Sequence, residues 1–184
     1  MIPISKNPPS RFPEGPPAKG DKPWWVAKVK SRQEKAFAFD LMKRNIEYYL
    51  PLITNITRRK DNNKPRKSII PLFSGYVSFS AEQFEANNLY STNRVSSIIE
   101  VRNQSEFLKQ LNKIYHTIDL KIPIQPVVIE KLELGLEVEV DTGPMRGTCG
   151  KVVKNLGGNK IAIFVEGLGV AAITVDASQV SEIN

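Results

Sequence analysis

The segment 138–153 near the C-terminus constrains the fold more than any other part of the chain. It opens with alternating apolar and acidic residues over 138–141, the period of a half-buried strand. Gly143 and Pro144 follow, then Gly147, and then a second apolar run. Both glycines can adopt left-handed dihedrals that a Cβ opposes, and the proline fixes φ between them. The pattern predicts two strands joined by a tight turn that depends on glycine.

Short strands of this kind continue to the end of the chain. From Leu134 onward, runs of five or six residues are separated by glycine turns near 143–144, 157–159 and 167–169. Such close spacing predicts a small, all-β, five-stranded barrel over residues 130–184. Any small barrel could use similar turns, so the segment alone does not define a function.

The composition excludes several classes of protein. No apolar run approaches about 20 residues, so no membrane span is expected. No signal peptide is evident, and the single cysteine, Cys149, cannot form an internal disulfide, so we expect a cytoplasmic monomer. Cys149 itself is expected to be a small buried residue of the second strand.

The net charge of +7 is unevenly distributed. Residues 22–119 contain 17 Lys and Arg against 9 Asp and Glu, a net charge of +8. Residues 120–184 contain 6 against 8, a net charge of −2. The basic part is therefore the candidate for nucleic-acid binding, and the acidic part is better suited to a protein partner.

Hydrophobic periodicity predicts an α+β fold for residues 22–119, an antiparallel sheet flanked by helices. The six prolines of residues 1–21 predict a disordered, extended arm, and Pro123 and Pro126 predict a linker over 120–129. Ser31 is the expected N-cap of the first helix, whose buried stripe is Phe37, Ala38, Leu41 and Met42. The expected strands are 24–30, 47–59, 68–70, 76–79 and 98–101, and the expected helices are 32–45, 81–89 and 104–118.

Three segments resemble the NusG family of transcription elongation factors. They are Lys22 to Lys30 with its Trp-Trp pair, Tyr49 to Thr54, and Pro71 to Val77, in the same order as in the N-terminal domain of that family. The segment 138–153 resembles the KOW motif that follows in the same family. One departure is Ser74, where the family usually has proline.

The resemblance implies a regulator that binds the clamp helices of RNA polymerase, closes over the DNA and suppresses pausing. The aromatic residues at the matching positions are Phe73, Tyr76 and Trp24, and we expect Phe73 to be exposed at its turn as an interface anchor. Core packing is the alternative for each of the three.

The N-terminal part is more similar to the specialised branch of the family, the RfaH- and UpxY-type antiterminators of long operons such as surface-polysaccharide operons. In that branch the corner between the first strand and helix reads the non-template DNA strand. Lys30 and Lys43 lie at matching positions, whereas Asp40 replaces a DNA-facing histidine.

Two clusters of basic residues could contact nucleic acid, and a solvated surface is the alternative for both. The strand-to-helix corner carries Lys30, Arg32, Lys35, Lys43 and Arg44. The tip of a hairpin carries Arg58, Arg59 and Lys60.

In the family, the KOW domain recruits a ribosomal protein or a termination factor. The equivalent contact residues are Met145, Leu168 and Val170. General factors have Phe and Arg at the positions of Met145 and Val170, which puts that recruitment in doubt for this chain.

The sequence offers no catalytic constellation. His116 is the only histidine, no Cys/His cluster could hold zinc, and no phosphate-binding glycine loop precedes a helix. We therefore expect a binding protein, not an enzyme, with no cofactor and no metal. The alternative to a transcription regulator is an RNA-binding ribosome-assembly or translation module that uses its KOW domain.

Overall fold

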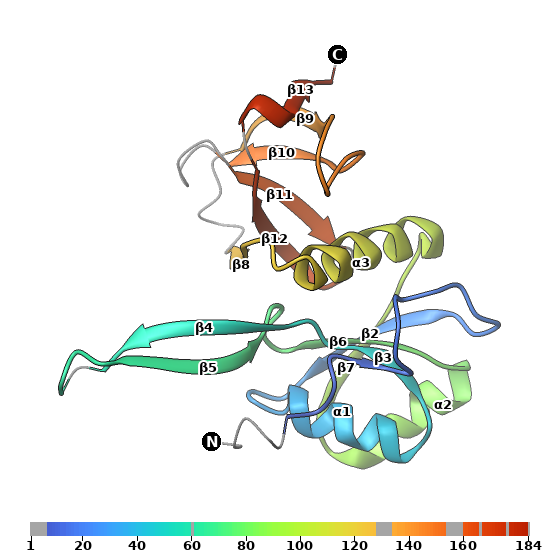
Figure 1. The fold of residues 1–184 in the computed structure, drawn as a ribbon. Helices are drawn as coiled ribbons and strands as arrows, with labels where there is room; N and C mark the ends of the chain where they lie inside the picture. Colours follow the sequence, from blue (N-terminus) through green and yellow to red (C-terminus); the bar gives the residue numbers. More distant parts are fainter. Residues whose placement is uncertain are drawn as a thin grey trace. The chain divides into compact units, whose positions relative to one another are not determined.

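The computed structural model describes residues 7–183 except residues 60, 128–133, 154–159, 166 and 176. Its internal contacts divide the chain into two compact units. Unit 1 comprises Met1–Gly15 and Lys22–Glu100, and unit 2 comprises Pro16–Asp21 and Val101–Asn184 (Figure 1). The predicted N-terminal domain extends to residue 119, whereas unit 1 ends at Glu100. The helix expected at 104–118 therefore falls in unit 2.

Unit 1 is built on a five-stranded antiparallel sheet, which agrees with the predicted α+β class. The order is β1-β3-β6-β2-β7, with every neighbouring pair antiparallel. The strands are β1 (Arg11–Phe12), β2 (Trp24–Val29), β3 (Glu47–Tyr49), β6 (Tyr76–Ser80) and β7 (Val95–Glu100). Two α-helices and a 3₁₀ helix complete it: α1 (Glu34–Lys43), α2 (Gln83–Asn88) and η2 (Leu89–Thr92).

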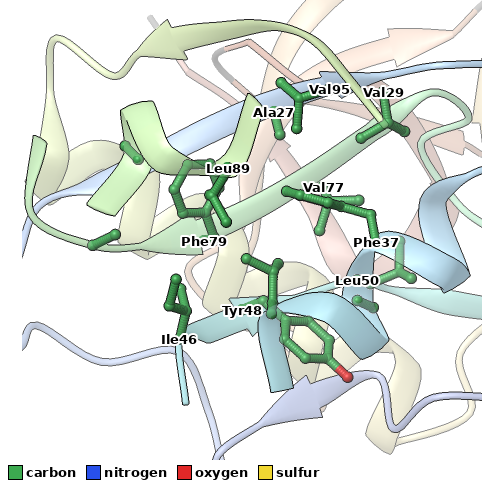
Figure 2. Packing of buried hydrophobic residues seen from close by; sticks show 14 residues of the cluster. Ala27, Val29, Phe37, Ile46, Tyr48, Leu50, Val77, Phe79, Leu89 and Val95 are labelled. Carbon is green, nitrogen blue, oxygen red and sulfur yellow. The ribbon is translucent and has the colours of Figure 1, made fainter. Parts of the chain in front are cut away.

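The hydrophobic core of unit 1 lies between this sheet and its helices. Phe37 of α1 meets Phe79 of β6 edge to face, with ring centroids 6.5 Å apart (Figure 2). Phe37, Ala38 and Leu41 are fully buried in this cluster, and Met42 packs against its edge. The predicted stripe of α1 is therefore confirmed, because residues three and four apart share one helix face.

The start of α1 differs from the prediction. Gln33 occupies the N-cap position and Ser31 lies outside the helix. Arg32 has a φ of 61°, a left-handed conformation, in the turn where the Gln33 N–H donates to the Lys30 carbonyl over 3.1 Å. Ser31 and Arg32 therefore belong to the tight turn after β2, and the helix begins at Glu34.

A two-stranded ribbon, β4 (Leu52–Arg58) with β5 (Pro65–Pro71), is separate from the five-stranded sheet. The predicted strand 47–59 is thus two strands, β3 and β4. The break falls at Pro51, which has no N–H to donate to a ladder, and whose carbonyl instead accepts the Leu72 N–H over 2.8 Å.

The N-terminal arm is ordered where the structure describes it, in contrast to the expected disordered arm. Arg11 pairs with Tyr49 along the sheet edge and is only 6% exposed. Its guanidinium forms an ion pair with Glu47 and lies 5.6 Å from the centre of the Trp24 ring. Proline density alone did not reveal these partners, which anchor the arm.

Unit 2 contains a six-stranded antiparallel sheet in the order β13-β9-β10-β11-β12-β8. Five strands were predicted; the sixth, β8, lies in the predicted linker. Among the described residues the edge strands β13 and β8 are not paired with each other, so the sheet is open. The strands are β8 (Ile124–Val127), β9 (Leu134–Val140), β10 (Cys149–Val153), β11 (Lys160–Val165), β12 (Gly169–Thr174) and β13 (Val180–Glu182).

The helix α3 (Gln104–Asp119) belongs to unit 2 and matches the predicted amphipathic helix. Phe107, Leu111 and Ile114 are buried, as its periodicity predicted. Thr117 is also buried; its hydroxyl donates to the Lys113 carbonyl over 2.7 Å, and its oxygen lies 3.5 Å from the Met145 sulfur. Met145 belongs to the Gly-Pro turn, so α3 packs on that turn.

The glycine-dependent turn is confirmed. Gly143 and Gly147 have φ values of 81° and 79°, and the Gly147 N–H donates to the Val140 carbonyl over 2.8 Å. The expected burial of Cys149 is wrong, because its side chain is exposed. Gly150 faces inward instead: a Cβ there would lie 2.3 Å from Cγ2 of Ile161.

Candidate nucleic-acid interface

The corner after β2 is joined to the loop that follows η2. The Lys30 N–H donates to the Arg94 carbonyl over 2.8 Å, and Lys30 Nζ donates to Asn93 Oδ1 over 2.7 Å. Asn93 has a φ of 57°, a conformation that asparagine tolerates better than most residues. These bonds hold the exposed Lys30 ammonium beside the Arg94 loop.

Arg94 connects this loop to α1. Its Nε donates to Asp40 Oδ2 over 2.6 Å, and its Nη1 donates to Gln33 Oε1. The side chains of Arg94 and Asp40 are 34% and 21% exposed, so the pair is partly shielded from water. A planar guanidinium can hold both partners at once, which fixes its orientation.

A cavity of about 270 Å³ opens at this place. It is lined by Asp40, Lys43, Arg44, Thr92 and Arg94. Arg44 is positioned by bonds from its guanidinium to Ser91 Oγ, at 3.0 Å, and to the Asn88 carbonyl, at 3.5 Å. Three cations against one carboxylate leave an excess positive charge, which suits a phosphate group. We call Lys30, Lys43, Arg44 and Arg94 the basic corner.

Three residues predicted for this corner, Lys30, Arg32 and Lys35, do not line the cavity. Arg32 is exposed in its left-handed turn. Lys35 is half-buried, and its Nζ donates to the Ile69 carbonyl at the base of the ribbon over 2.6 Å. Burial lowers the pKa of Lys35 from its usual value, and the neighbouring Glu34 carboxylate opposes that shift. The Lys35 side chain thus links α1 to β5.

The second predicted cluster lies at the end of the ribbon. Arg58 and Arg59 are exposed there, and the Arg59 N–H donates to the Lys64 carbonyl over 3.0 Å across the turn. Lys60, predicted as part of this cluster, lies outside the described residues. The structure therefore keeps two separate basic surfaces, the corner and the ribbon tip.

The aromatic residues predicted to contact polymerase are mostly covered. Phe73 is 5% exposed, so the expected exposed anchor is wrong for this structure. Trp24 is 1% exposed and contributes to the interior, whereas Tyr76 is half-buried at the start of β6. Large apolar side chains are often buried in a core, and this alternative of core packing applies to Phe73 and Trp24.

The turn that carries Phe73 is held from two sides. We call residues 73–76 the aromatic turn. The Gly75 N–H donates to Glu34 Oε1 over 2.7 Å, and the Gly75 carbonyl accepts the Val29 N–H over 2.8 Å. Glu34 is 5% exposed, so a buried carboxylate at the start of α1 fixes the turn.

The three predicted contact residues of the C-terminal part are also covered. Met145, Leu168 and Val170 are 6%, 5% and 3% exposed. The expectation that they form an accessible partner surface is wrong for this structure. The reason is clear for Met145, whose sulfur lies 3.5 Å from the buried Thr117 hydroxyl oxygen of α3.

Sequence reasoning missed Arg94 and Glu34. Arg94 lies in a short irregular loop without periodicity, and only its contacts with Asp40 and Gln33 reveal its role. Glu34 lies three residues after the expected N-cap Ser31, and its carboxylate accepts a hydrogen bond from Gly75, 41 positions away.

In the part of the chain that the structure describes, every helix is too short or too polar to span a bilayer. Within the same residues, no group of three or more His, Cys, Asp or Glu is arranged to hold a metal ion.

Unit 1 is thus a basic α+β unit with an open cavity bordered by cations. The family model described as transcription termination factor nusG matches residues 22–131, more than half of the chain. The chain belongs to the NusG family, whose members are transcription factors that bind RNA polymerase, and its broad role is transcription elongation. A search of curated proteins found no significant match.

Proposed function

We propose that this chain is a specialised elongation regulator that suppresses pausing and termination by RNA polymerase on particular long operons. Surface-polysaccharide operons of the type served by RfaH- and UpxY-like antiterminators are the favoured class. Family membership supports the elongation role, and the resemblance of residues 22–77 supports the specialised branch.

The observation that carries this proposal is the basic corner. Its cavity of about 270 Å³ combines fixed cations with the polar Thr92 and Asp40. A single-stranded nucleic acid offers both phosphates for the cations and unpaired polar edges for Asp40 and Thr92. The ligand we propose is the non-template DNA strand exposed in the elongation complex.

Polymerase binding is proposed for the face around the aromatic turn. The clamp helices would contact Tyr76, which is half-buried, with Phe73 contributing once its side chain is uncovered. Trp24 supports the sheet beneath from the interior. Large aromatic side chains give such an interface much of its binding energy.

For the C-terminal sheet we propose a KOW-type module that recruits a basic protein, such as a ribosomal protein or a termination factor. Residues 120–184 carry a net charge of −2, which favours a basic partner and disfavours RNA. The alternative function, an RNA-binding ribosome-assembly or translation module, is therefore the less supported one.

A reconstituted, paused elongation complex tests the proposal. Full-length protein should bind the complex and shorten the pause. The variant K30Q/K43Q should lose recruitment, with the slope of log affinity against log salt flattened by about 1.4 for two lost single-strand contacts. The matched control K109Q/K151Q removes two exposed charges elsewhere and should behave as wild type. An unchanged pause with wild-type protein would contradict the proposal.

A further inference from the structure

We propose that the β4–β5 ribbon binds double-stranded B-form DNA by entering the major groove. Residues 52–71 contain six Lys and Arg against one Asp, a net charge of +5 on a single hairpin. This inference deepens the nucleic-acid part of the proposed function, but the ribbon surface does not overlap the basic corner. The ribbon is proposed to bind duplex DNA, whereas the basic corner is proposed to bind a single strand.

The ribbon has the dimensions that this groove accepts. Seven residues of β4 pair with seven of β5, from Leu52 opposite Pro71 to Arg58 opposite Pro65. At a rise of about 3.3 Å per residue the paired part is roughly 23 Å long, and its strands are about 4.8 Å apart. The major groove of B-DNA is about 12 Å wide and about 8.5 Å deep, which admits a two-stranded ribbon.

The pairing register places complementary groups on one face. Arg58 lies opposite Pro65, and Ile56 lies opposite Lys67. Side chains of directly opposed residues share a face, so Arg58, Ile56 and Lys67 lie together. All three are exposed, Ile56 at 60%. Cations suit the phosphates on the groove walls, and an apolar side chain suits the thymine methyl groups on its floor.

The ribbon is a separate element and not part of a packed face. It forms a two-stranded sheet of its own, and Figure 1 shows both strands continuing beyond the rest of unit 1. The described residues from Thr57 to Lys67 are all exposed, and Pro65 is the only apolar one among them. Ile56, just before this range, is a single exposed apolar side chain beside a net charge of +5. That is too little for the apolar centre of a protein interface, so charge complementarity favours DNA.

The same geometry separates DNA from RNA. The major groove of an A-form RNA duplex is deep and narrow, and side chains on a ribbon cannot enter it. We therefore expect the ribbon to prefer a DNA duplex over an RNA duplex of the same sequence.

The test measures binding of full-length protein to a labelled DNA duplex, to the matching RNA duplex and to single-stranded DNA at several salt concentrations. The variant R58Q/K67Q should bind the DNA duplex more weakly, with the salt slope reduced by about 1.8 for two lost contacts. The charge-preserving variant R58K/K67R should keep the wild-type slope, and the matched control K109Q/K151Q should bind as wild type. Circular dichroism checks that each variant is folded.

An R58Q/K67Q variant with wild-type duplex affinity and slope would overturn the proposal. Equal binding to the RNA and DNA duplexes would overturn insertion into the groove. Salt-sensitive binding of the ribbon to polymerase without DNA would assign the surface to a protein instead. Because no polymerase is needed for duplex binding, failure here leaves the pause assay, and with it the proposed function, separately testable.

Discussion

The basic corner and the aromatic turn are both bonded to the C-terminal end of β2, through Lys30 and Val29 respectively, and they differ in accessibility. The corner keeps its cations at the surface around an open cavity. The aromatic turn, predicted to be equally accessible, has Phe73 only 5% exposed. Both regions depend on the start of α1, through Gln33 for the corner and Glu34 for the turn.

The difference shows for which residue types exposure can be predicted from the sequence. Burying an unpaired cation costs several kcal/mol, so a cluster of lysines and arginines has to remain at the surface. An aromatic side chain gains free energy by burial either in a core or in an interface. Residue type therefore predicted the exposure of Lys30 and Arg32, and it could not decide between core and interface for Phe73.

The largest effect that would sharpen this comparison is expected from Phe73→Ala. A covered phenylalanine should cost about 3 kcal/mol of unfolding free energy when truncated, because the substitution removes buried area and leaves a cavity. Urea denaturation measures it. A loss below about 1 kcal/mol would return Phe73 to the class of exposed anchors and remove the contrast with the corner.

Glu34→Ala should have a smaller effect. It leaves the Gly75 N–H without its carboxylate acceptor in a nearly closed site, at a cost of about 1–3 kcal/mol. The control Glu34→Gln keeps an acceptor and should lose less in the same urea titration. Equal losses from both variants would mean that the charge, not the hydrogen bond, holds the aromatic turn.

Arg94→Lys should have the smallest effect on stability, about 1 kcal/mol, since a lysine cannot bond to Asp40 and Gln33 together. Single-stranded DNA binding should weaken as the corner loses its fixed geometry. The matched change Arg58→Lys in the ribbon should leave stability unchanged, because only charge is needed there. Thermal unfolding and anisotropy titrations measure both; identical behaviour of the two variants would show that the corner needs charge alone.

Much of the fold followed from local patterns. The stripe of α1, the helix α3 and the left-handed glycines at 143 and 147 were predicted because each depends on neighbours within a few residues. That the segment of β1 is ordered could not be predicted, because Arg11 is buried against Glu47 and Trp24, which are distant in sequence. The predicted strand 47–59 is divided at Pro51, because a proline has no N–H to donate to the ladder of the sheet.

The site was predictable only in part, for the same physical reason. Lys30, Lys43 and Arg44 were identified from charge, and they do lie at the corner. Lys35 was misplaced because its hydrogen bond to Ile69 is a tertiary contact. Met145 was expected to be accessible because the family resemblance assigned it to a partner-contact surface, yet it lies against Thr117 of α3.

The central claim is that the basic corner holds the single-stranded non-template DNA of an elongation complex. Replacing Lys43 with a photo-crosslinking residue, in a complex whose non-template strand is labelled, tests this most directly. The account predicts a crosslink from position 43 to the unpaired part of that strand, competed by excess wild-type protein, and none from the same residue at position 151. Crosslinks from position 43 to polymerase alone would contradict it.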